Sequence, residues 1–142
     1  MNKTSFIKRA LSVLLVSVLI SACSGGESGT ENISAIESTT LINSNEDNPD
    51  FAIIDLRTPE EFNQGYVQNA VLIDYYEKDF VIKLNDLTKN KTYLIYCHSG
   101  VRSGKTLKRM KKLGFEQVYN MADGMVGWNA AQLPTVKPNL EP

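Results

Sequence analysis

The sequence predicts a single α/β domain, with a parallel sheet flanked by helices on both faces. Short apolar runs alternate with segments that have helical spacing and helix caps, which is typical of parallel α/β sheets. The run Phe51–Leu56 is apolar at every position but one, as in a strand buried on both faces. The roughly 110 residues from Ile33 onwards are enough for one hydrophobic core.

The first 22 residues have the pattern of a bacterial lipoprotein signal peptide. Three basic residues precede the apolar stretch Leu11–Ile20, which is too short to span a membrane. The stretch Leu19–Cys23 resembles a lipobox, in which the cysteine becomes the lipidated first residue of the mature protein. We therefore expect cleavage before Cys23 and a Gly/Ser-rich flexible tether over residues 23–32. The alternative is an ordinary secretory signal that is cleaved nearby.

Processing at this point changes the charge and the thiol content of the chain. Lys plus Arg falls to 12 (15 less 3) against 16 acidic residues, so no basic stripe indicates a nucleic-acid partner. A lipid on Cys23 predicts a bacterial cell-envelope protein on the periplasmic side, and Ser24 favours the outer membrane. Cys97 is then the sole free thiol, without an internal disulfide partner.

Two capping motifs and two apolar runs define the first half of the predicted domain, which covers residues 33–135. Ser34 and Glu37 form a capping box, and Thr58-Pro59 followed by Glu61 forms another with proline at the first helical position. The predicted elements are a helix to about Asn43, the strand Phe51–Leu56, a short helix ended by Gly65, and the strand Ala70–Asp74.

The second half continues the alternation of strands and helices. The segment after Pro134 is proline-rich, so we expect residues 136–142 to be a frayed tail. The predicted elements are a helix over Phe80–Leu87, a strand over Thr92–Tyr96, a helix over Lys105–Leu113 with Gly114 as its cap, a strand over Gln117–Met121 and a helix over Trp128–Gln132.

The loop after Thr92–Tyr96 predicts a reactive cysteine. Cys97 lies where a parallel strand ends, which is where such sheets bind ligands. Small residues follow it, as a loop of inward N–H groups needs, and such groups together with a helix N-terminus lower a thiol pKa from about 8.5. Arg102 offers a guanidinium to the sulfur or to a bound oxyanion. We expect an exposed thiolate; the alternative is a small buried hydrophobe at the end of the strand.

Three stretches, in this order, resemble the single-domain rhodanese family of sulfurtransferases. Asp55–Ala70 is similar to the N-terminal signature of the family, and Cys97–Ser103 is similar to its active-site loop. The segment from Leu113 to Trp128 resembles the sequence that follows that loop. Tyr66 and Asn69 depart from the signature, at positions outside the catalytic loop.

The resemblance implies a rhodanese-like fold and a persulfide mechanism that needs no cofactor and no metal. Cys97 would attack the outer sulfur of thiosulfate or a related donor, and a small thiol, cyanide or a protein thiol would accept that sulfur. Asp55, Arg57 and Glu61 belong to the family signature, and we expect a structural role for them, with an Arg57–Glu61 ion pair at the first turn after a strand. The alternative is a direct part in catalysis. His98, next to the nucleophile, would lie at the rim. The implied substrate-binding residues are His98, Ser99, Gly100, Val101, Arg102 and Ser103.

Two other functions stay open at this point. Phosphatases and arsenate reductases use a similar loop, with one more residue between Cys and Arg than the four found here. The smaller ring suits a sulfur atom better than a phosphoryl group. A membrane-tethered domain could instead carry persulfide sulfur to one membrane partner, or sense redox state for it, because a tether raises local concentration.

Overall fold

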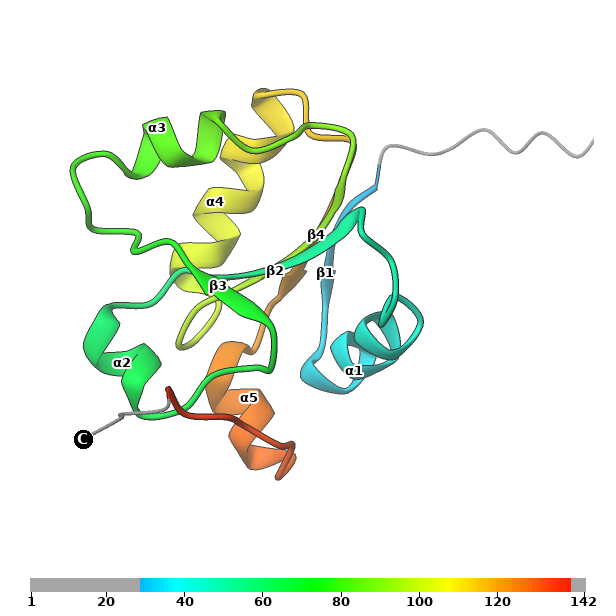
Figure 1. The fold of residues 1–142 in the computed structure, drawn as a ribbon, viewed down its shortest axis with the longest axis vertical. Helices are drawn as coiled ribbons and strands as arrows, with labels where there is room; N and C mark the ends of the chain where they lie inside the picture. The colour runs from blue at the N-terminus through cyan, green and yellow to red at the C-terminus, as the bar shows by residue number, and fades with distance from the viewer. Residues whose placement is uncertain (1–28, 139–142) are drawn as a thin grey trace, which may run out of the picture.

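The strands form one parallel sheet in the order β1-β5-β4-β2-β3 (Figure 1). The computed structural model describes residues 29–138, so the predicted signal peptide and Cys23 lie outside the described residues. Strands β4 and β2 are central, which brings their carboxyl ends side by side. The strands are β1 Thr30–Ile33, β2 Phe51–Asp55, β3 Ala70–Leu72, β4 Thr92–Tyr96 and β5 Gln117–Met121.

Helices cover both faces of this sheet, which confirms the predicted fold class. Figure 1 shows α3 and α4 on one face and α1 and α5 on the other. Within residues 29–138, no helix has the length and apolar character needed to cross a membrane. The helices are α1 Ala35–Asn43, α2 Pro59–Asn63, α3 Phe80–Asn85, α4 Val101–Lys112 and α5 Gly124–Ala130.

The central strand β4 is buried on both of its faces. Tyr93 and Ile95 belong to the hydrophobic cluster under α3 and α4, whereas Leu94 and Tyr96 belong to the cluster under α1 and α5. All four side chains are 2% exposed or less. Complete burial of one such side chain stabilises the fold by roughly 1.5–3 kcal/mol. Burial on both faces explains why the residues of β4 are apolar without a break. It also fixes the position of Cys97, the residue that follows the strand.

The register between β2 and β4 aligns the two segments that carry the predicted site residues. Asp55 is paired with Tyr96 across the sheet, and the next N–H, that of Leu56, donates to the Tyr96 carbonyl at 2.8 Å. The residues that follow each strand therefore leave the sheet at the same edge. The segments that carry Arg57 and Cys97 lie side by side for this reason, although 40 positions (97 less 57) separate the two residues in the chain.

Both predicted capping boxes are present, but two helices begin earlier than predicted. Ser34 with Glu37, and Thr58 with Glu61, exchange the two hydrogen bonds that define the motif. Helix α4 begins at Val101 rather than Lys105, and α5 begins at Gly124 rather than Trp128. Neither of these two helices has a side-chain cap at its N-terminus, so the sequence lacks the usual signal there.

The predicted tether and tail both reach too far into the folded part of the chain. Thr30–Asn32 lies in β1 and pairs with β5, not in a flexible tether. The strand was missed because it is a polar edge strand whose middle residues are exposed. Val136 exchanges two backbone hydrogen bonds of 2.9 Å with Tyr66, so this residue is not frayed. Local amino-acid composition does not predict backbone pairing between segments that are far apart in the chain.

Candidate active site

Cys97 lies in a tight loop between the end of β4 and the start of α4. Gly100 is the N-cap residue of α4 and has φ +82°, a left-handed conformation that favours glycine. A Cβ at Gly100 would collide with the carbonyl oxygen of Ala122, so the close approach also requires glycine. The loop can curl around Cys97 only because this position lacks a side chain.

The first N–H groups of α5 hold the outer side of this loop. Met125 N–H donates to the Cys97 carbonyl at 3.0 Å, and Val126 N–H donates to the His98 carbonyl at 3.0 Å. A peptide group points its C=O and N–H in opposite directions. Because the His98 carbonyl faces α5, the N–H of Ser99 on the same peptide faces Sγ of Cys97.

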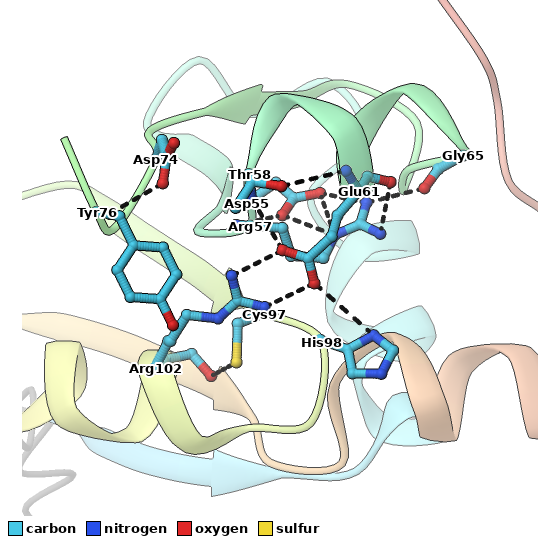
Figure 2. Close-up of polar contacts among 11 residues, drawn as sticks. Asp55, Arg57, Thr58, Glu61, Gly65, Asp74, Tyr76, Cys97, His98 and Arg102 are labelled. Atoms are coloured by element: carbon cyan, nitrogen blue, oxygen red, sulfur yellow. Dashed lines mark hydrogen bonds and ion pairs between the residues drawn. The ribbon is translucent and has the colours of Figure 1, made fainter.

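Hydrogen-bond donors surround Sγ of Cys97. Backbone N–H groups of Ser99, Arg102 and Ser103 point at it, and Ser103 Oγ lies 3.4 Å from it (Figure 2 shows the thiol beside Arg102). Burial alone raises the pKa of the thiol, but these donors outweigh burial and lower the pKa below its ordinary value. Cys97 is only 1% exposed, so the prediction of an exposed thiol is wrong. The loop that supplies the donors also covers the sulfur.

Arg102 is held by Glu61 of α2 across the loop. Its two terminal nitrogens donate to the two carboxylate oxygens of Glu61, each at 2.7 Å (Figure 2). These hydrogen bonds lower the pKa of Glu61 to about 2, against a smaller opposing effect of burial. They also raise the pKa of Arg102, and the ring of Tyr76 lies 5.5 Å from the guanidinium carbon. The bidentate pair joins α2 to the first turn of α4.

Asp55 and Arg57 form a second ion pair, deep in the turn between β2 and α2. Nη2 of Arg57 lies 2.6 Å from Oδ2 of Asp55, and the two side chains are 5% and 0% exposed. Nη1 of Arg57 donates to the backbone carbonyl of Glu61 at 3.1 Å, and Nη2 also donates to that of Gly65 at 2.8 Å. The predicted Arg57–Glu61 ion pair is therefore wrong, because the Glu61 carboxylate turns to Arg102 instead.

A cavity of about 240 Å³ opens beside the loop. His98 lies at its rim with its side chain 60% exposed, and His98 Nδ1 is 3.9 Å from Oε1 of Glu61. Among the described residues, no three His, Cys, Asp or Glu side chains are grouped so that they could hold a metal ion. The cavity is lined by Arg57, Glu61, Gln64, Gly65, His98, Met125, Asn129 and Thr135.

Comparison with known proteins assigns this loop to a family. The family model described as "Rhodanese-like domain" matches residues 38–131. The chain belongs to the rhodanese family. A protein from Allochromatium vinosum named "Sulfurtransferase" is 29% identical to this rhodanese over 106 residues, which are 75% of this chain and 97% of that protein. Family and relative together support a sulfur-transfer activity.

Solved structures agree with the rhodanese assignment. A rhodanese-like domain protein from Staphylococcus aureus is 32% identical, with a TM-score of 0.57 over 78% of this chain and 96% of that one. A polysulfide-sulfur transferase homodimer from Wolinella succinogenes has a TM-score of 0.62 at 23% identity, over 82% of this chain and 85% of that one. At that identity the likeness shows the fold alone.

The predicted loop residues of this rhodanese differ in how close their side chains lie to Cys97. Ser103 is fully buried against Sγ, and Gly100 acts through its backbone. The side chains of His98, Ser99 and Val101 are exposed at the rim. His98 therefore points outward, as predicted. Arg102 is within reach of Cys97, but its two terminal nitrogens already bind Glu61.

Two tyrosines near the rhodanese loop were not predicted as site residues. Tyr96 is buried in β4, where its hydroxyl accepts the Val67 N–H at 3.1 Å and its ring lies 5.8 Å from the Arg57 guanidinium carbon. Tyr76 is 68% exposed and covers Arg102. No local sequence pattern marks either tyrosine as a site residue. Tyr96 looks like any other apolar residue of a strand, and Tyr76 lies in a loop between β3 and α3.

Proposed function

We propose that this rhodanese domain transfers sulfane sulfur through a persulfide on Cys97. The Cys97 thiolate attacks the outer sulfur of a donor such as thiosulfate, and a new S–S bond forms to the enzyme. The old S–S bond breaks, and sulfite leaves with the electron pair. A thiol or cyanide then attacks the outer sulfur of the persulfide and restores the Cys97 thiolate.

The convergence of donors on Sγ carries this proposal. Three backbone N–H groups and the Ser103 hydroxyl surround the sulfur and lower the pKa of the thiol. The thiolate is the nucleophile in sulfur chemistry, so this setting favours attack at neutral pH. The same N–H groups are preorganised for the negative charge on a persulfide, which lies one atom further out.

The test is loading of the full chain with a sulfane donor, followed by intact mass. We expect thiosulfate to add one sulfur atom to the wild-type protein and to release an equal amount of sulfite. Replacement Cys97→Ser should abolish both results. Equal sulfur uptake by Cys97→Ser, or no uptake by the wild type from either thiosulfate or a singly charged sulfane donor such as methanethiosulfonate, would exclude the persulfide mechanism.

We propose in addition that Cys23 carries a lipid and anchors the domain to a bacterial envelope membrane on the periplasmic side. The support is the lipobox-like stretch Leu19–Cys23, which lies outside the described residues. A tethered domain would favour an acceptor thiol on a membrane protein, because tethering raises its effective concentration.

The anchor is tested by cell fractionation. Cys23→Ser should move the protein from the membrane fraction to the soluble envelope fraction. The matched variant Cys97→Ser changes the other cysteine in the same way and should stay with the membrane. Membrane retention of Cys23→Ser would refute the anchor and leave the sulfur-transfer proposal untouched.

A further inference from the structure

The cationic groups beside Cys97 determine which donors this site can hold. A donor such as thiosulfate carries two negative charges and approaches a thiolate that is itself negative. Its sulfonate therefore needs a cationic partner that is not already neutralised. Two guanidinium groups, those of Arg57 and Arg102, lie close to the loop.

Arg57 cannot fill that role without losing a buried ion pair. Its guanidinium is paired with Asp55 and also donates to two backbone carbonyls, and the whole residue is 4% exposed. Separation of a buried pair leaves an uncompensated charge, which is strongly destabilising. Arg57 is thus part of the scaffold that supports the turn after β2.

Arg102 is neutralised by the bidentate contact with Glu61. Each of its two terminal nitrogens donates one of its N–H groups to Glu61 at 2.7 Å, so the carboxylate already offsets the guanidinium charge. A sulfonate that reaches the remaining N–H groups of Arg102 therefore also meets the negative charge of Glu61. The remaining neighbour, His98, has its Nδ1 3.9 Å from an oxygen of the same carboxylate. Within the described residues, Arg57 is the only Arg or Lys that lines the cavity beside the loop.

The formal charges of Asp55, Arg57, Glu61 and Arg102 cancel, so the Cys97 thiolate leaves this group of side chains with one net negative charge. We propose that this site selects sulfane donors with at most one negative charge, such as organic thiosulfonates and persulfides, and discriminates against the thiosulfate dianion. Glu61 is the residue that sets this preference, because it neutralises Arg102. The inference rests on the proposed persulfide mechanism and specifies its donor.

Methanethiosulfonate and thiosulfate form a suitable pair of probes. Each presents an outer sulfur to the Cys97 thiolate and leaves the same persulfide on the enzyme. With CH₃SO₂S⁻ the S–S bond breaks to release methanesulfinate, and with thiosulfate it breaks to release sulfite. The leaving group takes the electron pair in both cases, so no external oxidant or reductant is needed.

The experiment measures kcat/KM for each donor in the full chain and takes the ratio of thiosulfate to methanethiosulfonate. Comparison of this ratio between variants cancels the intrinsic reactivity of the two donors. The variant is Glu61→Gln, because glutamine keeps the side-chain length and can retain the capping hydrogen bond to Thr58. The control is Glu60→Gln, which removes the same charge from an exposed neighbour on α2.

We expect Glu61→Gln to raise the ratio about tenfold, the scale of one unit charge a few ångströms from the donor in partly solvated surroundings. Glu60→Gln should change it less than about twofold, because exposed charges are screened. In the wild type, added salt should speed thiosulfate loading more than methanethiosulfonate loading, which tests the idea even if Glu61→Gln fails to fold.

The outcomes separate the two proposals. A ratio that is unchanged or lower in Glu61→Gln, or that rises equally in Glu60→Gln, overturns the charge selection alone. Salt that slows thiosulfate loading relative to methanethiosulfonate loading also overturns it. If neither donor places sulfur on Cys97, the persulfide mechanism itself fails.

Discussion

Ser103→Ala tests the hydroxyl that faces Sγ of Cys97. Ser103 Oγ lies 3.4 Å from Sγ of Cys97 and 3.3 Å from the Gly100 carbonyl oxygen. A hydroxyl has one proton, so it donates to only one of these acceptors at a time. We expect the proton to turn to Sγ when the thiol ionises. Alanine removes that donor and leaves the three backbone N–H groups in place.

The expected shift follows from the strength of one charged hydrogen bond. Such bonds contribute about 1.5–3 kcal/mol, and the contact of Ser103 to sulfur is long and shared with Gly100, which favours the lower end. Since one pKa unit corresponds to about 1.36 kcal/mol, the pKa of the Cys97 thiol should rise by about one unit. At a pH below the pKa of the wild-type thiol, the rate of sulfur loading should fall about tenfold with it.

The assay is a pH titration of the ultraviolet absorbance of the thiolate. The spectrum of Cys97→Ser in the same background is subtracted, which removes the signals of Cys23 and of the tyrosines. Thr106→Val is the matched control, because it removes a buried hydroxyl from α4 that donates to the Arg102 carbonyl and not to Sγ. An unchanged or lower pKa in Ser103→Ala, or an equal rise in Thr106→Val, would refute the reasoning.

Two further predictions concern stability. Gly100→Ala should cost about 3 kcal/mol or more, because it adds a collision with the Ala122 carbonyl to a left-handed φ of +82°. Gly114→Ala, at the same φ but with open space around its Cβ, should cost only about 1–2 kcal/mol; equal costs in urea unfolding would disprove the collision. The pKa of Glu61 is lowered from 4.5 to about 2 on folding, so its contribution is complete above pH 4.5 and is lost as the pH falls toward 2. Unfolding free energies measured across this range should show that loss in the wild type and not in Glu61→Gln.

The sequence by itself determined the fold class, the place of the candidate nucleophile and most element positions. Apolar runs buried on both faces and two capping boxes are local patterns, and they held in the structure. The position of Cys97 at the end of β4 followed from the same patterns, because a parallel sheet gathers the carboxyl ends of its strands at one edge.

Only the tertiary structure decided how charge is distributed around the sulfur. From sequence spacing, Glu61 lies four positions from Arg57 and suits a local pair with it. In the fold, α2 and α4 leave neighbouring strand ends and bring Glu61 against Arg102, 41 positions away. The bidentate geometry there satisfies both charges, while Asp55 takes Arg57 in the buried turn. Contacts between distant segments decide which arginine binds Glu61, and a local sequence pattern cannot predict such contacts.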